Sequence, residues 1–168
     1  MVGKRSTARF ANGAVSAVLV VFFLAHGVLG SLALVFGIIG PLAWLVWVGM
    51  ALVAVHVVMS VVTSREQLSD AQRPPSPRKK RHLALKWATG ALLAACIAVH
   101  VASSNALIAR LAIVALAIAL AAHLCVGSKS LLTDLGADRR YKNAFRAAAC
   151  AFAALFVVAV LASAFQAA

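Results

Sequence analysis

Apolar residues dominate the chain in five long runs separated by short polar or glycine-containing stretches. The runs cover about residues 14–36, 42–63, 83–103, 106–126 and 144–165. A helix that crosses a bilayer core about 30 Å thick needs about 20 apolar residues, because each residue adds about 1.5 Å. Every run meets that length. The pattern therefore predicts an all-α fold, a polytopic membrane protein with five transmembrane helices.

The connections between the runs are too short to hold a further domain, so we expect one transmembrane domain over residues 1–168. The longest connection, 64–82, contains Pro74-Pro75-Ser76-Pro77 and is expected to be a loop. A Gly37-Ile38-Ile39-Gly40-Pro41 turn should join the first two helices, and Ser104-Asn105 the third and fourth. The first run exceeds the about 7–15 apolar residues of a signal peptide, which predicts a retained helix.

The amino-acid composition excludes several classes of protein. Residues of the AVILMFWYC set make up 64% of the chain and charged residues 12%. A soluble domain has about a quarter charged residues, and a disordered chain is far less hydrophobic, so both classes are excluded. The three cysteines, Cys96, Cys125 and Cys150, lie inside apolar runs and form no C-x-x-C pair. The spacing indicates no disulfide framework, thiolate metal site or covalent c-type haem.

The charges indicate an orientation. The chain has sixteen Lys and Arg residues but only four Asp and Glu residues, which gives a formal net charge of +12. All the cations except Arg110 flank the same ends of the runs, together with all four acids. By the positive-inside rule this side is cytoplasmic, which places the N-terminus in the cytoplasm and the C-terminus outside the cell membrane. Trp44 and Trp47 lie near the outer end of the second run, as an interfacial aromatic belt would. This distribution favours a lipid surface over nucleic acid as the partner of the basic residues.

Four of the five histidines, His26, His56, His100 and His123, lie inside the first four runs, one in each. His56 and His123 lie roughly 13 and 9 Å from the nearest cytoplasmic cation, and His26 and His100 roughly 25 and 21 Å. They therefore form two pairs at two depths, with each pair drawn from two helices. This arrangement predicts two bis-histidine haems in a four-helix bundle made by the first four helices. For any one histidine, a hydrogen bond to a neighbouring helix is an alternative interpretation. His82, next to the basic run 78–81, is expected in a solvated loop beside anionic lipid.

Two local patterns accompany these histidines. Thr89-Gly90 precedes His100, and His123-x-x-x-Gly127 continues to Asp134-Leu135-Gly136. With one histidine in each of the first four of five helices, the chain resembles the dihaem cytochrome b membrane-anchor subunit of the succinate dehydrogenase and quinol:fumarate reductase (succinate:quinone oxidoreductase) family.

The resemblance implies a proximal haem held by His56 and His123, a distal haem held by His26 and His100, and Lys129 beside a haem propionate. Both would be non-covalent haem b. It also implies a flavoprotein and an iron–sulfur subunit on the cytoplasmic face, with electrons passing between a dicarboxylate and a membrane quinone such as menaquinone. The chain itself would supply no catalytic residue. Ala121 stands where the family carries a glutamate, which argues against a carboxylate proton route.

Two other classes stay open at this point. One is the haem-b membrane subunit of another respiratory dehydrogenase or reductase, such as a formate dehydrogenase or a hydrogenase. The other is a haem-free multispan membrane protein that uses its histidines for packing or proton relay. The sequence also leaves a higher-order oligomer open.

Overall fold

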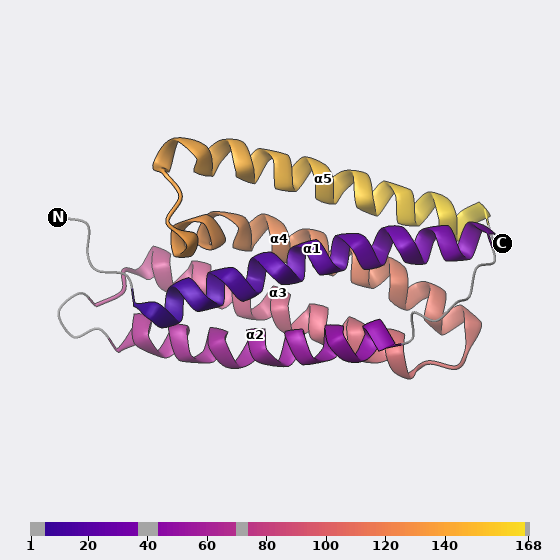
Figure 1. The fold of residues 1–168 in the computed structure, drawn as a ribbon, viewed down its shortest axis with the longest axis horizontal. Coiled ribbons are helices and arrows are strands. Elements are labelled where there is room, and N and C mark those ends of the chain that lie inside the picture. The colour runs from indigo at the N-terminus through magenta and orange to yellow at the C-terminus, as the bar shows by residue number, and fades with distance from the viewer. Residues whose placement is uncertain (1–5, 37–43, 70–73, 167–168) are drawn as a thin grey trace. The chain divides into compact units, whose positions relative to one another are not determined.

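The computed structural model describes residues 6–36, 44–69 and 74–166. Within these ranges the structure consists of five helices and contains no strand (Figure 1). The helices are α1 (Thr7–Phe36), α2 (Trp44–Leu68), α3 (Pro77–Ala102), α4 (Ala106–Leu135) and α5 (Arg139–Gln166). All five are long and apolar enough to cross a membrane. The predicted all-α fold with five membrane-spanning helices is confirmed.

Local side-chain chemistry explains where several helices begin and end. Ser76 caps α3, because its hydroxyl accepts the Lys79 N–H at 3.3 Å. Asn105 caps α4, where its Oδ1 atom accepts the N–H groups of Leu107 and Ile108 at 3.0 and 3.1 Å. α4 ends at Leu135, and Gly136 follows it with a φ of 92°, a left-handed conformation that glycine adopts without strain.

The helices extend beyond the apolar runs at their charged ends, which corrects the loop prediction for residues 64–82. Residues 64–68 belong to the last part of α2, and residues 77–82 belong to the first part of α3. Hydropathy marks only the part of a helix that lies in lipid, whereas backbone hydrogen bonding continues into water until a cap ends it. The same holds for α4, which continues past 126 to Leu135. The turn predicted at Gly37–Pro41 lies outside the described residues.

Contacts divide the chain into two compact units. The first comprises residues 1–75 and 131–137, and thus contains α1, α2 and the last turn of α4. The second comprises residues 76–130 and 138–168, and contains α3, the rest of α4, and α5.

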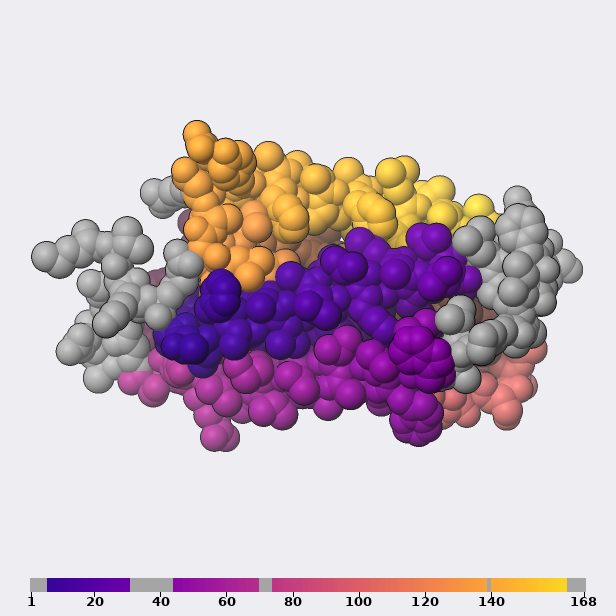
Figure 2. Space-filling model, viewed as in Figure 1, coloured from indigo at the N-terminus to yellow at the C-terminus, as the bar shows by residue number. Residues whose placement is uncertain are grey.

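In the first unit, α1 and α2 form an antiparallel pair with one register along their length. Ser6, just before α1, is hydrogen-bonded to Glu66 on α2 at 2.8 Å, and Asn12 on α1 to Ser60 at 3.3 Å. Further along, a Cβ atom at Gly49 would lie only 2.7 Å from Cε1 of Phe22, so the glycine makes room for the ring. Figure 2 shows the side chains of α1 (indigo) packed along those of α2 (magenta). Hydrogen bonds join one end of this pair, and ring packing joins the other.

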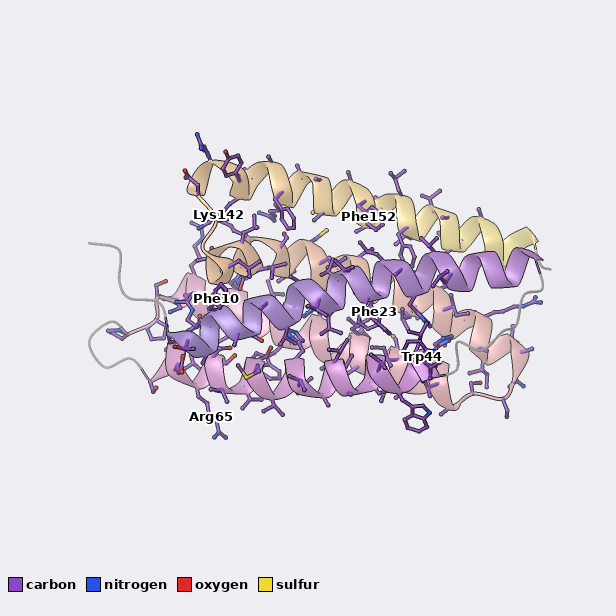
Figure 3. The ribbon with its side chains drawn as sticks, viewed as in Figure 1. Phe10, Phe23, Trp44, Arg65, Lys142 and Phe152 are labelled. Atoms are coloured by element: carbon purple, nitrogen blue, oxygen red, sulfur yellow. The ribbon has the colours of Figure 1, made fainter. Side chains whose placement is uncertain are left out.

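Many large apolar side chains face outward, as lipid contact requires. Val21 is 67% exposed, Trp47 is 77% exposed, and Leu155 on α5 is 70% exposed. Trp44 and Arg65 lie at opposite ends of α2 (Figure 3). α2 therefore has an aromatic end and a basic end, the separation that membrane interfaces favour.

Candidate functional site

The four intramembrane histidines are divided equally between the two units. His26 on α1 and His56 on α2 belong to the first unit, and His100 on α3 and His123 on α4 belong to the second. His56 contacts Ser16, which precedes His26 by ten residues on α1, so these two histidines differ in level by about 15 Å. The first unit thus presents its histidines at two levels and does not bring them together.

The second unit repeats this spacing. His123 contacts Thr89 on α3, and Thr89 precedes His100 by eleven residues. The two histidines of this unit therefore also differ in level by about 16 Å. His56 in the first unit and His123 in the second lie nearer the basic ends of their helices than His26 and His100 do.

His56 has a hydroxyl partner on α1. The Ser16 hydroxyl donates to the carbonyl oxygen of Asn12 at 2.7 Å. The same hydroxyl oxygen lies 3.2 Å from Nδ1 of His56. This geometry fits the tautomer of His56 that carries its proton on Nδ1, in which Nε2 is the acceptor.

His123 is held in the same way by Thr89. The Thr89 hydroxyl donates to the carbonyl oxygen of Leu85 at 2.8 Å, and its oxygen lies 3.1 Å from Nδ1 of His123. The ring also lies close to the α3 backbone, because a Cβ atom at Gly90 would be 3.2 Å from Cε1 of His123. Gly90 thus lets the imidazole approach, while the Thr89 hydroxyl lies within hydrogen-bond distance of its Nδ1 atom.

A neutral histidine with its proton on Nδ1 is the form that binds a metal through Nε2, and the partner of Nδ1 orients the ring. Ser16 and Thr89, the two residues whose hydroxyls contact these rings, were not predicted as site residues from the sequence. Thr89 appeared only as part of a local pattern, and Ser16 had no assigned role. These residues can be recognised as hydroxyl residues on a helix that packs beside a histidine. The sequence could not identify them because it does not give the register between the two helices.

The other two histidines have different surroundings. The imidazole of His26 lies parallel to the Phe22 ring, with centroids 6.1 Å apart and planes at 6°. Phe22 is also the ring that Gly49 accommodates, so α2 positions this pair. Nδ1 of His100 is buried. His82, the fifth histidine, is exposed.

The lysine predicted beside a propionate, Lys129, is exposed and lies six residues before the end of α4. A different lysine lies on the face of the second unit that carries His123. Lys86 is partly buried, and its Nζ atom donates a hydrogen bond to the Ser130 hydroxyl at 3.1 Å.

A buried ion pair lies at the basic end of the first unit. Arg9 donates through Nε and Nη2 to one carboxylate oxygen of Asp134, at 3.1 and 2.8 Å. The Asp134 side chain is only 6% exposed and that of Arg9 is 32% exposed. Gly13 permits the approach, because a Cβ atom there would lie 3.2 Å from Cβ of Asp134. The Asp134-Leu135-Gly136 pattern therefore serves to attach the end of α4 to α1.

Metal-ligating side chains do not cluster in the part of the chain that the structure describes. No group of three or more His, Cys, Asp or Glu residues could hold a metal ion there. A bis-histidine haem needs only two protein ligands, so this finding concerns other types of metal site.

Comparison with known proteins adds no relative. No protein-family model matches the chain, and no match is found among curated proteins or solved structures.

Proposed function

We propose that the chain is a dihaem cytochrome b, the membrane-anchor subunit of a succinate dehydrogenase or fumarate reductase type complex. In this proposal His56 and His123 bind one haem, and His26 and His100 bind the other. The observation that supports it best is the matched pair of hydroxyl contacts, Ser16 to Nδ1 of His56 and Thr89 to Nδ1 of His123.

The residues present fit a haem. Neutral imidazole is a common ligand of haem iron, and a fixed Nδ1 proton raises the basicity of the coordinating Nε2 atom. A flat macrocycle also needs space next to the helix backbone. Gly127, one turn after His123, provides it: a Cβ atom there would meet no described atom within 4 Å. Gly30, one turn after His26, is open in the same sense.

The assignment of ligand pairs rests on the depths counted along the sequence. Within one unit the two histidines differ in level by about 15 Å, which is too far for both to bind one iron. When bound, each haem supplies a carrier for one electron. Two imidazoles of the chain would hold each haem iron. The apolar side chains around the haem would tune its reduction potential.

The proposed partners follow from the resemblance of the histidine pattern to the family and from the charge distribution. The basic helix ends would face the cytoplasm, where an iron–sulfur and a flavoprotein subunit would dock. Electrons would pass between these subunits and a quinone in the bilayer. A different dehydrogenase or reductase would use the same haems with other partners.

A reduced-minus-oxidised optical spectrum of the purified protein, with haem measured per chain, tests this proposal. We expect two haems b per chain in the wild type. The haem assigned to His56 and His123 should be lost in both the His56→Ala and the His123→Ala variant. The second haem should be lost in both the His26→Ala and the His100→Ala variant. His82→Ala is the matched control and should retain both. A colourless wild-type protein would contradict the proposal and favour a haem-free role for the histidines.

A further inference from the structure

We infer that Cys125 on α4 and Cys150 on α5 form a redox-active thiol pair, which a quinone dissolved in the bilayer oxidises to a disulfide. Neither cysteine has a role in the proposed function, and the inference does not depend on haem. The sequence contains no C-x-x-C pair, and these two cysteines are 25 residues apart. Only the fold of the second unit brings them together.

The two cysteines lie at the same level of the second unit. α4 ends at Leu135, α5 begins at Arg139, and the two helices run in opposite directions (Figure 1). Cys125 lies ten residues before the end of α4 and Cys150 eleven residues after the start of α5, so their levels differ by only about 1.5 Å. Their side chains are hydrogen-bonded to each other. Two thiols in contact across neighbouring helices are the starting geometry that a disulfide requires.

Cys125 lies on a different face of α4 from His123. Two residues two positions apart in a helix are separated by about 200° around its axis. The contacts within the second unit agree, because His123 meets Thr89 on α3 whereas Cys125 meets Cys150 on α5. A disulfide between α4 and α5 would therefore form on the side of α4 that faces away from the histidine.

Both thiols are accessible to a reagent in the membrane. Cys125 and Cys150 are free and only half-buried. Each lies four residues from a cation, Cys125 before Lys129 and Cys150 after Arg146, so the pair lies about one turn from the basic ends of its helices. A quinone ring that moves in the bilayer can reach a half-buried thiol at this depth.

The reaction balances with a quinone as the only co-reactant. Two S–H bonds break and one S–S bond forms, and the two electrons and two protons reduce the quinone to a quinol. A dithiol reverses the reaction by thiol–disulfide exchange. The bond would hold α5 against α4 when oxidised quinone is abundant, and thus make this helix pair respond to the redox state of the membrane.

Cys96, the third cysteine, is the matched control. It is buried on α3, seven residues beyond Thr89, the residue that meets His123. Cys125 is displaced from His123 in the opposite direction, so the levels of Cys96 and Cys125 differ by about 13 Å. A disulfide joins Cα atoms no more than about 7 Å apart, which excludes Cys96 from the pair.

The test counts free thiols of the full-length protein in anaerobic lipid vesicles. The oxidant is a naphthoquinone with both free positions of its quinone ring methylated, so that it accepts electrons but does not add a thiol. The remaining thiols are then labelled with a maleimide in dodecyl sulfate and counted by intact mass. We expect three labels before oxidation and one afterwards, on Cys96, and dithiothreitol should restore all three.

The cysteine variants should separate the pair from the control. Cys96→Ser should lose both of its labels on oxidation, whereas Cys125→Ser and Cys150→Ser should each keep both of theirs. Peptide mapping of the oxidised wild type should show Cys125 linked to Cys150, a result that does not depend on the folding of any variant.

Three labels on the oxidised wild type would overturn the inference. So would a linked peptide that contains Cys96 or that joins two copies of the chain. These failures differ from failure of the proposed function. A colourless protein with one label would contradict only the proposed function, and a protein with two haems and three labels would contradict only the thiol pair.

Discussion

At the scale of single residues, two hydroxyl groups contact two histidines in the same way. Ser16 and Thr89 each donate to a carbonyl one turn back on their own helix, and each hydroxyl oxygen also lies within hydrogen-bond distance of an imidazole Nδ1 atom. The sequence identified His56 and His123 from their depth in apolar runs. It could not identify their partners, because a serine or threonine in a membrane helix most often bonds to its own backbone. Which hydroxyl meets which ring depends on helix register and rotation.

Replacing Thr89 with valine keeps the shape of the side chain and removes the hydroxyl that contacts Nδ1 of His123. A polar group that loses its hydrogen-bond partner away from water costs about 1–3 kcal/mol. We therefore expect Thr89→Val to bind one of the two haems about tenfold or more weakly, measured by transfer to an external haem acceptor. Ser128→Ala is the control, since the Ser128 hydroxyl donates to a backbone carbonyl of its own helix. Equal haem loss in both variants would show that Thr89 has no specific role.

At the scale of helices, the apolar runs gave the number and type of elements, and the structure lengthened them. The run that ended near 63 belongs to a helix that continues to Leu68, and the third helix begins at Pro77 rather than near 83. Hydropathy could not show these turns because they are polar. A serine followed by proline at 76–77 is a helix start in its own right, and Ser76 is the cap that the structure uses.

The pairing of α1 with α2 gives a prediction at this scale. A Cβ atom at Gly49 would lie 2.7 Å from the Phe22 ring, which itself stacks on His26. We expect Gly49→Ala to lower the stability of the protein by about 1–3 kcal/mol, because the ring must move within a packed helix pair. Thermal unfolding in detergent, followed by circular dichroism, measures the effect.

When both variants are measured without bound haem, Gly30→Ala is the matched control on α1, since its new methyl group would meet no described atom within 4 Å. It should be neutral or stabilising by up to about 1 kcal/mol, because alanine favours a helix more than glycine does. A Gly49→Ala protein as stable as this control would contradict close packing of Phe22 on α2.

At the scale of the whole molecule, the distribution of charge is the dominant feature. In the first unit, Arg9 on α1 and Arg65 on α2 lie at the same end of the antiparallel pair, opposite Trp44. In the second, Lys86 on α3 and Lys129 on α4 lie at one end, and Arg110 lies toward the other. Each unit is thus polarised by itself, which the sequence predicted from spacing alone.

We expect a reporter fused to the N-terminus to remain in the cytoplasm and one fused to the C-terminus to be exported. Five spans place the two ends on opposite sides, and the cations select which end stays inside. Paired fusions to green fluorescent protein and alkaline phosphatase measure the two locations. Fluorescence of both fusions would be incompatible with five crossings.

The ion pair between Arg9 and Asp134 has a consequence for biosynthesis. Its partners are 125 residues apart in the chain, so the ribosome completes α1 long before it makes the carboxylate that α1 needs. At about 5–20 residues per second, the arginine waits roughly 6–25 seconds. During that interval the insertion machinery or the lipid headgroups must accommodate its charge. The contact between α1 and the end of α4 therefore cannot form until the fourth helix has been made, whereas the contacts between α1 and α2 can form earlier.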